Sequence, residues 1–243
     1  MNLIEHALDI GQSSLSEHDA KQFLSGFGIN VCRETLVDAA AAEPAESAVA
    51  AAVSIGFPVV LKVSGTHLLH KTEVEGVALN LRSELGVRDE ARRLLRIPGC
   101  EGLLVQEMVK GDRELVCGLV RDRQLGPCVM FGLGGVLTEV LDDAVFRVAS
   151  ITAAEAAEML AEIRSAKILG AFRGQAPVDR IALAGILVAL GNIGLQHEAI
   201  QAIDINPVKI RHNGMPVVVD ALITLQKKGP SWSDEGGILN FEF

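Results

Sequence analysis

The sequence lacks an excess of basic residues. Lys and Arg number 22 against 31 Asp and Glu, so the formal net charge is -9, and the isoelectric point is near 5.2. A protein that coats nucleic acid needs a basic surface for the phosphate backbone, so we expect no nucleic-acid partner. A single nucleotide is a different case, because a few local cations and backbone amides are enough to bind it.

Paired cysteines are also missing. The four cysteines lie far apart and form no C-x-x-C pair; they are Cys32, Cys100, Cys117 and Cys128. This spacing excludes a zinc knuckle and a disulfide framework, and it favours a reducing, cytoplasmic compartment.

Targeting and membrane-spanning segments are not indicated. The first 15 residues contain Glu5 and Asp9 and have no basic stretch before an apolar run, unlike a signal peptide. The longest charge-free apolar stretch, residues 181–195, is too short and too interrupted by glycine to cross a bilayer. We therefore expect no membrane association and interpret this stretch as a buried helix.

What the sequence does contain is a mixture of strand and helix patterns. Apolar residues make up 49% of the chain, enough for one large domain or two small lobes. Because strands follow one another both through tight turns and through helices, the pattern predicts an α+β or mixed α/β protein. The main expected strands span residues 59–63, 77–81, 103–106, 114–120, 127–131, 202–205 and 217–219. The main expected helices begin after Ser16, near Thr152 and near Asp179, and a loosely ordered tail covers 227–243.

Two segments carry candidate phosphate chemistry in the first half of the chain. Lys62 lies inside the apolar strand 58–63, where it either points to solvent or acts as a fixed cation beside a phosphate. The polar segment 66–73 contains His67, His70 and Lys71 but no third ligand at metal spacing, so a zinc site is not predicted. This segment is either an ordinary exposed loop or a loop in which an imidazole accepts a phosphoryl group and a neighbouring ammonium group neutralises its charge.

Two further motifs lie in the second half. The Gly-rich stretch 131–136, with Gly134 and Gly135, is either a tight turn or a place where backbone N–H groups approach a phosphate. Asn206 and Asp220 each end a strand, and antiparallel pairing across the turn near 212–214 would bring them together. Hard oxygen ligands of this kind suit Mg²⁺, although Asp-x-Asn-Pro is also an ordinary turn signal.

The order of these motifs resembles that in the ATP-grasp subunit of ADP-forming acyl-CoA synthetases, which is the beta subunit of ADP-forming acetate–CoA ligase. This subunit is a relative of the nucleotide-binding subunit of succinyl-CoA synthetase. The similarity runs from about Leu15 to about Thr224. The blocks that carry it are 15–21, 27–29, 57–62, 70–77, 105–109, Glu114, 121–122, 126–135, Glu139, Asp143, Arg147, 172–174, 177–179 and 204–207.

The resemblance implies an ATP-grasp fold, in which two α+β lobes clasp a nucleotide. Residues 1–30 would form an N-terminal helix of the larger lobe, 31–101 the smaller lobe, and 102–226 the rest of the larger lobe. It also implies the reaction acyl-CoA + ADP + phosphate ⇌ acid + CoA + ATP through phosphohistidines. A CoA-binding alpha-type subunit is then expected as a partner on a separate chain.

Residue roles follow from the same resemblance. ATP or ADP and Mg²⁺ are the implied cofactors, Asn206 and Asp220 the metal ligands, and His70 the residue that carries the phosphoryl group. The implied nucleotide-binding residues are Lys62, Lys71, Gln106, Glu107, Met108, Glu114, Gly134 and Gly135.

Two departures from the family pattern keep an alternative open. Glu75 stands where the family usually has glycine, and Ala202 where it usually has an acid. They favour a non-catalytic ATP-grasp module that binds nucleotide and regulates a partner. An ATP-grasp ligase that makes an acyl phosphate without a phosphohistidine is a third reading, against which His70 speaks.

Overall fold

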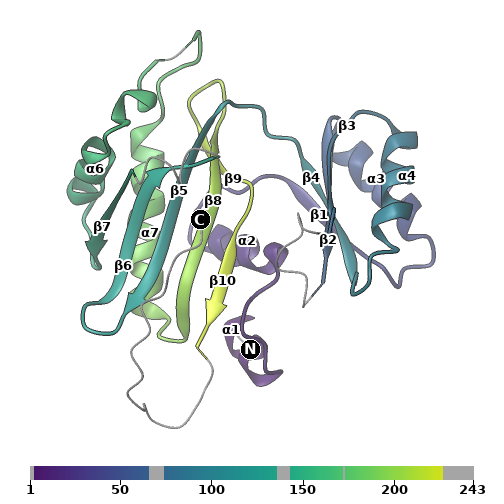
Figure 1. Cartoon of the computed structure of the whole chain (residues 1–243), viewed down its shortest axis with the longest axis horizontal. Helices are drawn as coiled ribbons and strands as arrows, with labels where there is room; N and C mark the ends of the chain where they lie inside the picture. Colours follow the sequence, from purple (N-terminus) through teal and green to yellow (C-terminus); the bar gives the residue numbers. More distant parts are fainter. Residues whose placement is uncertain (1–2, 66–73, 136–142, 172, 227–243) are drawn as a thin grey trace.

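The computed structural model describes residues 3–65, 74–135, 143–171 and 173–226. In these residues the strands form two separate sheets, each covered by helices on one face (Figure 1). The chain is thus α+β, as the sequence predicts. None of the described helices is long and apolar enough to cross a membrane.

The smaller sheet has the strand order β1-β4-β2-β3 within the described part of the chain. Its strands are β1 (Glu34–Asp38), β2 (Val59–Ser64), β3 (Val77–Leu81) and β4 (Gly102–Glu107), with helices α3 (Pro44–Ile55) and α4 (Glu84–Leu94). The two helices and one face of this sheet share an apolar core that includes Val49, Leu61, Leu94 and Leu103. Pro44 at the start of α3 and the Ser83 cap of α4 fix where these helices begin.

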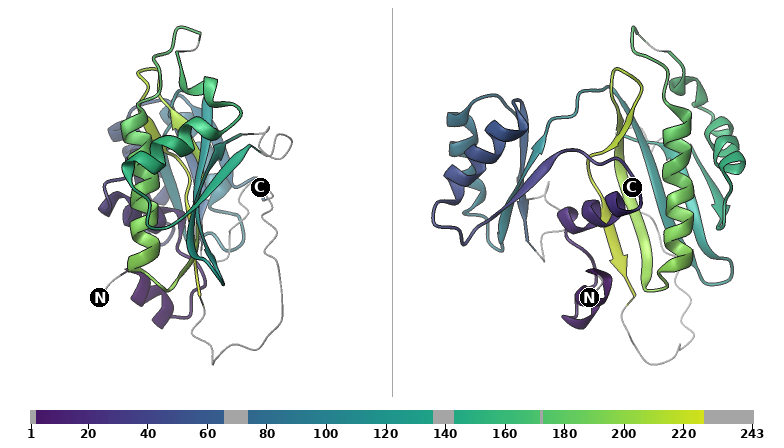
Figure 2. Two further views of the ribbon diagram at one scale, coloured as in Figure 1. Left: turned by 90° about the vertical axis from the view of Figure 1, so that its left-hand side faces the viewer. Right: turned by 180° about the vertical axis from the view of Figure 1, so that it is seen from behind.

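The larger sheet has the order β10-β8-β5-β6-β7, with β9 paired to β8. Its strands are β5 (Arg113–Asp122), β6 (Gly126–Leu133), β7 (Ala144–Val148), β8 (Ile200–Ile210), β9 (Pro216–Val218) and β10 (Leu222–Leu225). Helices α6 (Ala153–Glu162) and α7 (Arg180–Gln196), with the short 3-10 helix η1 (Ala166–Leu169), cover one face (Figure 2).

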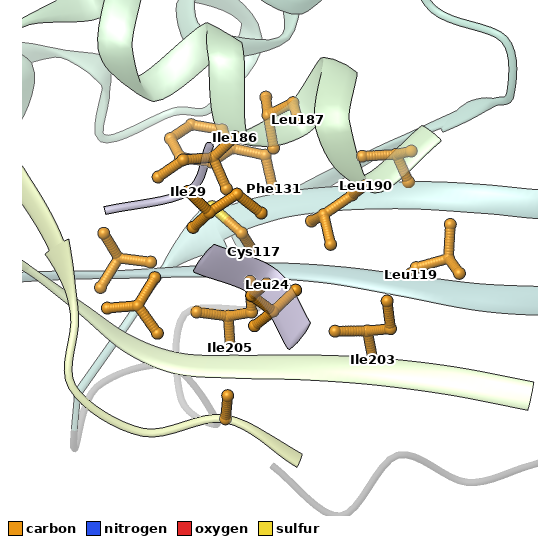
Figure 3. Close-up of a cluster of buried hydrophobic side chains, with 14 of the residues drawn as sticks. Leu24, Ile29, Cys117, Leu119, Phe131, Ile186, Leu187, Leu190, Ile203 and Ile205 are labelled. Carbon is orange, nitrogen blue, oxygen red and sulfur yellow. The ribbon is translucent and has the colours of Figure 1, made fainter. Parts of the chain in front are cut away.

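Helices α1 (Leu3–Asp9) and α2 (Glu17–Gly26) pack on the larger sheet as well. Leu24 of α2 and Ile29 lie in the same core as Cys117, Ile205 and Leu187 (Figure 3). The side chain of Ser16 accepts a hydrogen bond from the backbone N–H of Asp19, which caps α2 where the sequence predicts a helix start. Helix α2 lies between the larger sheet and the smaller lobe, and α1 lies below it in the view of Figure 1 (Figures 1 and 2).

Strand β4 follows residue 101, at which the sequence places the end of the smaller lobe. This strand pairs with both β1 and β2, and all of its residues are buried, so it is a central strand of the smaller sheet. The smaller lobe therefore extends to Glu107. Strand β8 is longer than predicted, and α1 and β10 were not predicted. The tail expected to be loosely ordered, residues 227–243, lies outside the described residues.

Candidate functional site

The smaller sheet turns a partly polar face towards the larger lobe. Side chains alternate between the two faces of a strand, so apolar Val59, Leu61 and Val63 lie in the core while Lys62 faces the other way. Glu34 of β1 and Gln106 of β4 contact the same neighbouring helix, α2, as Lys62 does. Alternation along the strand allows Lys62 to point to solvent, but its side chain is buried between the lobes.

Five charged side chains meet between the lobes; we call Glu17, Lys21, Glu34, Lys62 and Asp220 the α2 cluster. Glu17 Oε1 lies 2.8 Å from Lys21 Nζ and 2.6 Å from Lys62 Nζ. Lys62 Nζ also donates to Asp220 Oδ2 at 3.0 Å and to the carbonyl of Val219 at 3.2 Å. Lys21 pairs with Glu34 and donates to Gln106 Oε1 at 2.9 Å.

Both lysines in this cluster stay charged. Burial would lower the pKa of Lys62, but Asp220 and Glu17 outweigh it and raise the pKa above its ordinary value. Burial likewise acts against the charge on Lys21, and the carboxylate of Glu17 leads the groups that raise its pKa overall. The larger lobe therefore holds, through α2 and Asp220, a permanently cationic residue of the smaller lobe.

Asn206 lies on β8, Asp220 lies on the segment beside it, and their joint binding of a metal stays a prediction. Strands β9 and β10 both pair with the same edge of β8, with Val218 opposite Val208 and Leu222 opposite Asp204. The common register places Asp220, in the gap between β9 and β10, opposite Asn206.

Asp204 lies on the same strand as Asn206, a position that sequence analysis named only as part of a motif. It lies between the core residues Ile203 and Ile205, so its side chain faces away from the core of the larger lobe. Although much of its surface is accessible, burial around the carboxyl group and the nearby charge of Asp220 raise its pKa to about 6. The i, i+2 spacing from Asn206 is the sequence signal that identifies it.

Glu114 lies across the sheet on β5. Its carboxylate oxygen Oε1 is 2.9 Å from Lys209 Nζ, and the two residues are register partners. Gly134 and Gly135 follow β6 beside it. The backbone N–H of Gly134 donates to the Glu114 carbonyl at 2.9 Å, and a Cβ at Gly134 would lie 2.8 Å from the backbone of Leu115. Gly135 has φ +84. Close approach to β5 thus explains both glycines, and a phosphate contact by them stays a prediction.

Residues 106–108, which are among the implied nucleotide-binding residues, lead from the smaller lobe into the larger one. Here Glu107, Arg33 and Arg211 form a second ionic group, which we call the hinge cluster. Glu107 accepts from the backbone N–H of Arg33 at 2.9 Å and from Arg211 Nη2 at 2.7 Å. Burial would raise the pKa of Glu107, but these donors hold it below its ordinary value. The backbone N–H of Met108 donates to the Pro58 carbonyl. The side chains of Gln106 and Glu107 are therefore directed to the ionic clusters.

His67, His70 and Lys71 lie outside the described residues, and so does Glu139. Glu75, just beyond this segment, has φ 51, and its carbonyl accepts from Arg93 Nη1 at 2.9 Å. The left-handed backbone suits glycine, which gives a physical reason for the family's glycine at this place.

A cavity of about 520 Å³ opens beside the α2 cluster. Glu17 and Asp220 line it, together with Ser64 and Gly65, the last described residues before the segment that contains His70. Space for a reacting group therefore exists beside Glu17 and Asp220, the two carboxylates that contact Lys62.

The donor set of Asn206 and Asp220 fits a magnesium ion. Asn206 and Asp220 offer an amide and a carboxylate oxygen, and the Asp220 side chain is 41% exposed, so it is accessible to a ligand. Mg²⁺ prefers one or two such protein oxygens and takes its remaining ligands from water and phosphate. The described residues contain no group of three or more His, Cys, Asp or Glu placed to hold a metal.

Comparisons with known proteins agree with this geometry. The ATP-grasp domain family model matches residues 6–225. The chain is 37% identical over 218 residues to the beta subunit of acetate–CoA ligase (ADP-forming) I of Pyrococcus furiosus, covering 87% of this chain and 91% of that one. It is 43% identical over 173 residues to acetate–CoA ligase (ADP-forming) I of Archaeoglobus fulgidus. The chain spans 25% of that relative and 31% of the A. fulgidus enzyme II.

Solved structures give the same result. The acetyl-coenzyme A synthetase 1 of Ca. Korarchaeum cryptofilum, in complex with coenzyme A and Ca-AMPCP, superposes with a TM-score of 0.85 at 43% identity, over 92% of this chain and 98% of that chain. A second structure of that enzyme, with Mg-AMPPCP, has a TM-score of 0.80 at 43% identity over the same shares of the two chains, and its phosphohistidine segment points towards the nucleotide binding site. These matches confirm the ATP-grasp fold expected from the motif order.

Because the family model covers most of its length and a beta subunit of similar size is 37% identical to it, the chain belongs to the ATP-grasp domain family, together with the beta subunits of ADP-forming acetate–CoA ligases.

Proposed function

We propose that the chain is the nucleotide-binding part of an ADP-forming acyl-CoA synthetase. It would catalyse the half of acyl-CoA + ADP + phosphate ⇌ acid + CoA + ATP that moves a phosphoryl group between a histidine and ADP. The observation that carries the proposal is the ion pair between Lys62 of one lobe and Asp220 of the other, to which we add Asn206 as the second metal ligand. A cation and two oxygen ligands from different lobes are what a nucleotide phosphate held between lobes requires.

Each residue has a defined task in this proposal. The ammonium group of Lys62 contacts phosphate oxygens and neutralises their charge, while Asn206 and Asp220 hold Mg²⁺, which screens the charge of the phosphates. Residues 106–108 contact the base with backbone groups, since the side chains of Gln106 and Glu107 are engaged elsewhere. Glu114 lies close to the ribose, and Lys71, Gly134 and Gly135 complete the phosphate contacts.

His70 is the proposed phosphoryl carrier. In the direction of ATP synthesis, the P–N bond of phosphohistidine breaks, an oxygen of the ADP β-phosphate forms the new P–O bond, and the imidazole nitrogen keeps the electron pair. The cavity beside Ser64 and Gly65 offers the space in which the carrier meets the nucleotide. In the opposite direction the same histidine takes the γ-phosphoryl group of ATP.

The acid and CoA would bind on an alpha-type component, either a separate chain or another part of a longer protein. The Pyrococcus furiosus relative is a beta subunit and the Archaeoglobus fulgidus relatives are much longer than this chain, so both arrangements have a parallel. We place the protein in the cytoplasm on its cysteine pattern.

Calorimetry with Mg-ADP tests the nucleotide site. Wild type should bind, and Lys62→Met should lose about tenfold or more in affinity, because a charge-assisted contact to phosphate is removed. Lys167→Met, at an exposed lysine of η1, is the control and should bind like wild type. Absence of Mg-ADP binding by the wild type would refute the proposal.

Turnover tests the histidine relay. The chain is combined with its CoA-binding component, ATP, CoA and a panel of acids, and thioester and ADP are measured. His70→Ala should abolish turnover while keeping Mg-ADP binding. Turnover that survives this substitution contradicts the relay, and binding without any turnover in the wild type identifies the non-catalytic module that Glu75 and Ala202 favour.

A further inference from the structure

Glu17 is the residue of the α2 cluster that holds two ammonium groups at once. Its Oε1 contacts Lys21 Nζ at 2.8 Å and Lys62 Nζ at 2.6 Å, and its side chain is 4% exposed. Glu17 begins α2, where the Ser16 cap fixes the direction of the first turn. The carboxylate is therefore held by the helix start and cannot follow Lys62 outwards.

The other carboxylate on Lys62 has a competing task. Asp220 accepts from Lys62 through Oδ2, and it is also a proposed ligand of Mg²⁺. A carboxylate oxygen shared with an ammonium group is a poorer metal ligand, because the two cations repel each other. Binding of the metal nucleotide thus requires Asp220 to turn from Lys62 to the metal.

Charge balance shows what then remains. The α2 cluster contains two lysines and three carboxylates. When Asp220 serves the metal, Glu17 and Glu34 are left to balance Lys21 and Lys62 one to one. Since buried charges need compensation, Lys62 keeps a carboxylate of the α2 cluster beside it only if Glu17 stays in contact with it.

We propose that Glu17 is a positioning residue for the nucleotide site, which fixes the ammonium group of Lys62 and thereby frees Asp220 to bind the metal nucleotide. This inference rests on the proposed function. In the absence of Glu17, Lys62 keeps Asp220 as its one carboxylate of the α2 cluster, and the affinity for the metal nucleotide falls although Glu17 is not a proposed ligand of the metal or the phosphates.

The test is Glu17→Gln in the full chain, with Glu34→Gln as the matched control. Both substitutions remove one buried carboxylate from Lys21, but only Glu17 contacts Lys62. Calorimetry measures the affinity for ADP with and without Mg²⁺, and urea unfolding measures stability. We expect Glu17→Gln to weaken Mg-ADP binding about tenfold, and to weaken ADP binding without Mg²⁺ less. Glu34→Gln should change both affinities by less than about threefold.

Several results would overturn the inference. One is that Glu17→Gln binds Mg-ADP with wild-type affinity. Another is that Glu17→Gln and Glu34→Gln lose the same affinity, which would mean that Glu17 acts through stability alone. If Glu17→Gln does not fold, Glu17→Asp, which keeps the charge but withdraws it by one methylene, takes its place; it should weaken Mg-ADP binding, and wild-type affinity would refute the inference. A wild type that does not bind Mg-ADP overturns the proposed function as well, so the two failures are distinct.

Discussion

The two ionic clusters between the lobes are built in opposite ways. In the α2 cluster the cations are buried: the Lys21 side chain is 0% exposed and that of Lys62 is 9% exposed. In the hinge cluster the carboxylate of Glu107 is buried, whereas Arg33 is 65% exposed and Arg211 is 34% exposed. A long arginine that loses its partner can return to water, but buried Lys21 and its carboxylate partners Glu17 and Glu34 cannot. The α2 cluster should therefore be the more sensitive to loss of one member.

Lys21→Met should have the largest effect on stability. It leaves Glu17 and Glu34 without their shared buried cation, and breaking a buried pair by removing one partner costs about 3–5 kcal/mol. Urea unfolding followed by circular dichroism measures the free energy of unfolding. A loss below about 1 kcal/mol, the range of surface pairs, would contradict the distinction between the clusters.

Glu107→Gln should be milder, with a loss of about 1–2 kcal/mol, because both arginines regain solvent. The folded-state pKa of Glu107 lies below its ordinary value of 4.5. Its contribution is therefore present above that value and is lost as the pH falls through the lowered pKa. Unfolding at pH 7 and at pH 3 checks both points: the difference from wild type should shrink at pH 3, and a difference independent of pH would exclude an ionic origin.

His18→Asn should have a small effect that depends on pH. The hydrogen bond from His18 Nδ1 to Glu34, 2.8 Å long, raises the pKa of this histidine above 6.5. The contribution is present below pH 6.5 and is lost as the pH rises through the raised pKa. Thermal unfolding should show a loss below about 1 kcal/mol at pH 6 and less at pH 9. A larger loss at pH 9 would reverse the sign and refute the ion pair.

Glu46→Gln should change stability least. Glu46 pairs with Arg88 through two hydrogen bonds on the surface of the smaller lobe. Solvent and salt screen such a pair, so we expect no measurable change in urea unfolding at physiological ionic strength. A loss as large as that of Glu107→Gln would show that pairing geometry, rather than burial, determines the effect.

The sequence predicts most of the fold because its signals are local. The Ser16, Thr152 and Asp179 caps lie where helices α2, α6 and α7 begin. The alternation around the turn near residue 122 gives the β5–β6 hairpin. Local signals do not show which sheet β4 joins, because its pairing with β1 and β2 involves residues far away in the chain.

The site is predictable to a smaller extent. Asn206 and Asp220 follow from two strands joined by a turn, and Lys62 is conspicuous in an apolar strand. Glu17 and Lys21 carry no such signal, since charged residues at i and i+4 are ordinary on a helix surface. Their importance depends on Lys62, which lies 45 residues beyond Glu17 in the chain.

The position of β4 also shows how the two lobes are related in the chain. Residues 34–107 form the smaller lobe, and its first and last strands are antiparallel neighbours, with Glu34 opposite Gln106. The backbone N–H of Glu107 donates to the carbonyl of Arg33 at 2.9 Å. The chain therefore leaves the smaller lobe close to the point at which it enters it. The smaller lobe is thus an insertion into a larger lobe whose own core joins Leu24 and Ile29 to Leu115 and Phe131. A short turn between Arg33 and Met108 should close the larger lobe without the insertion.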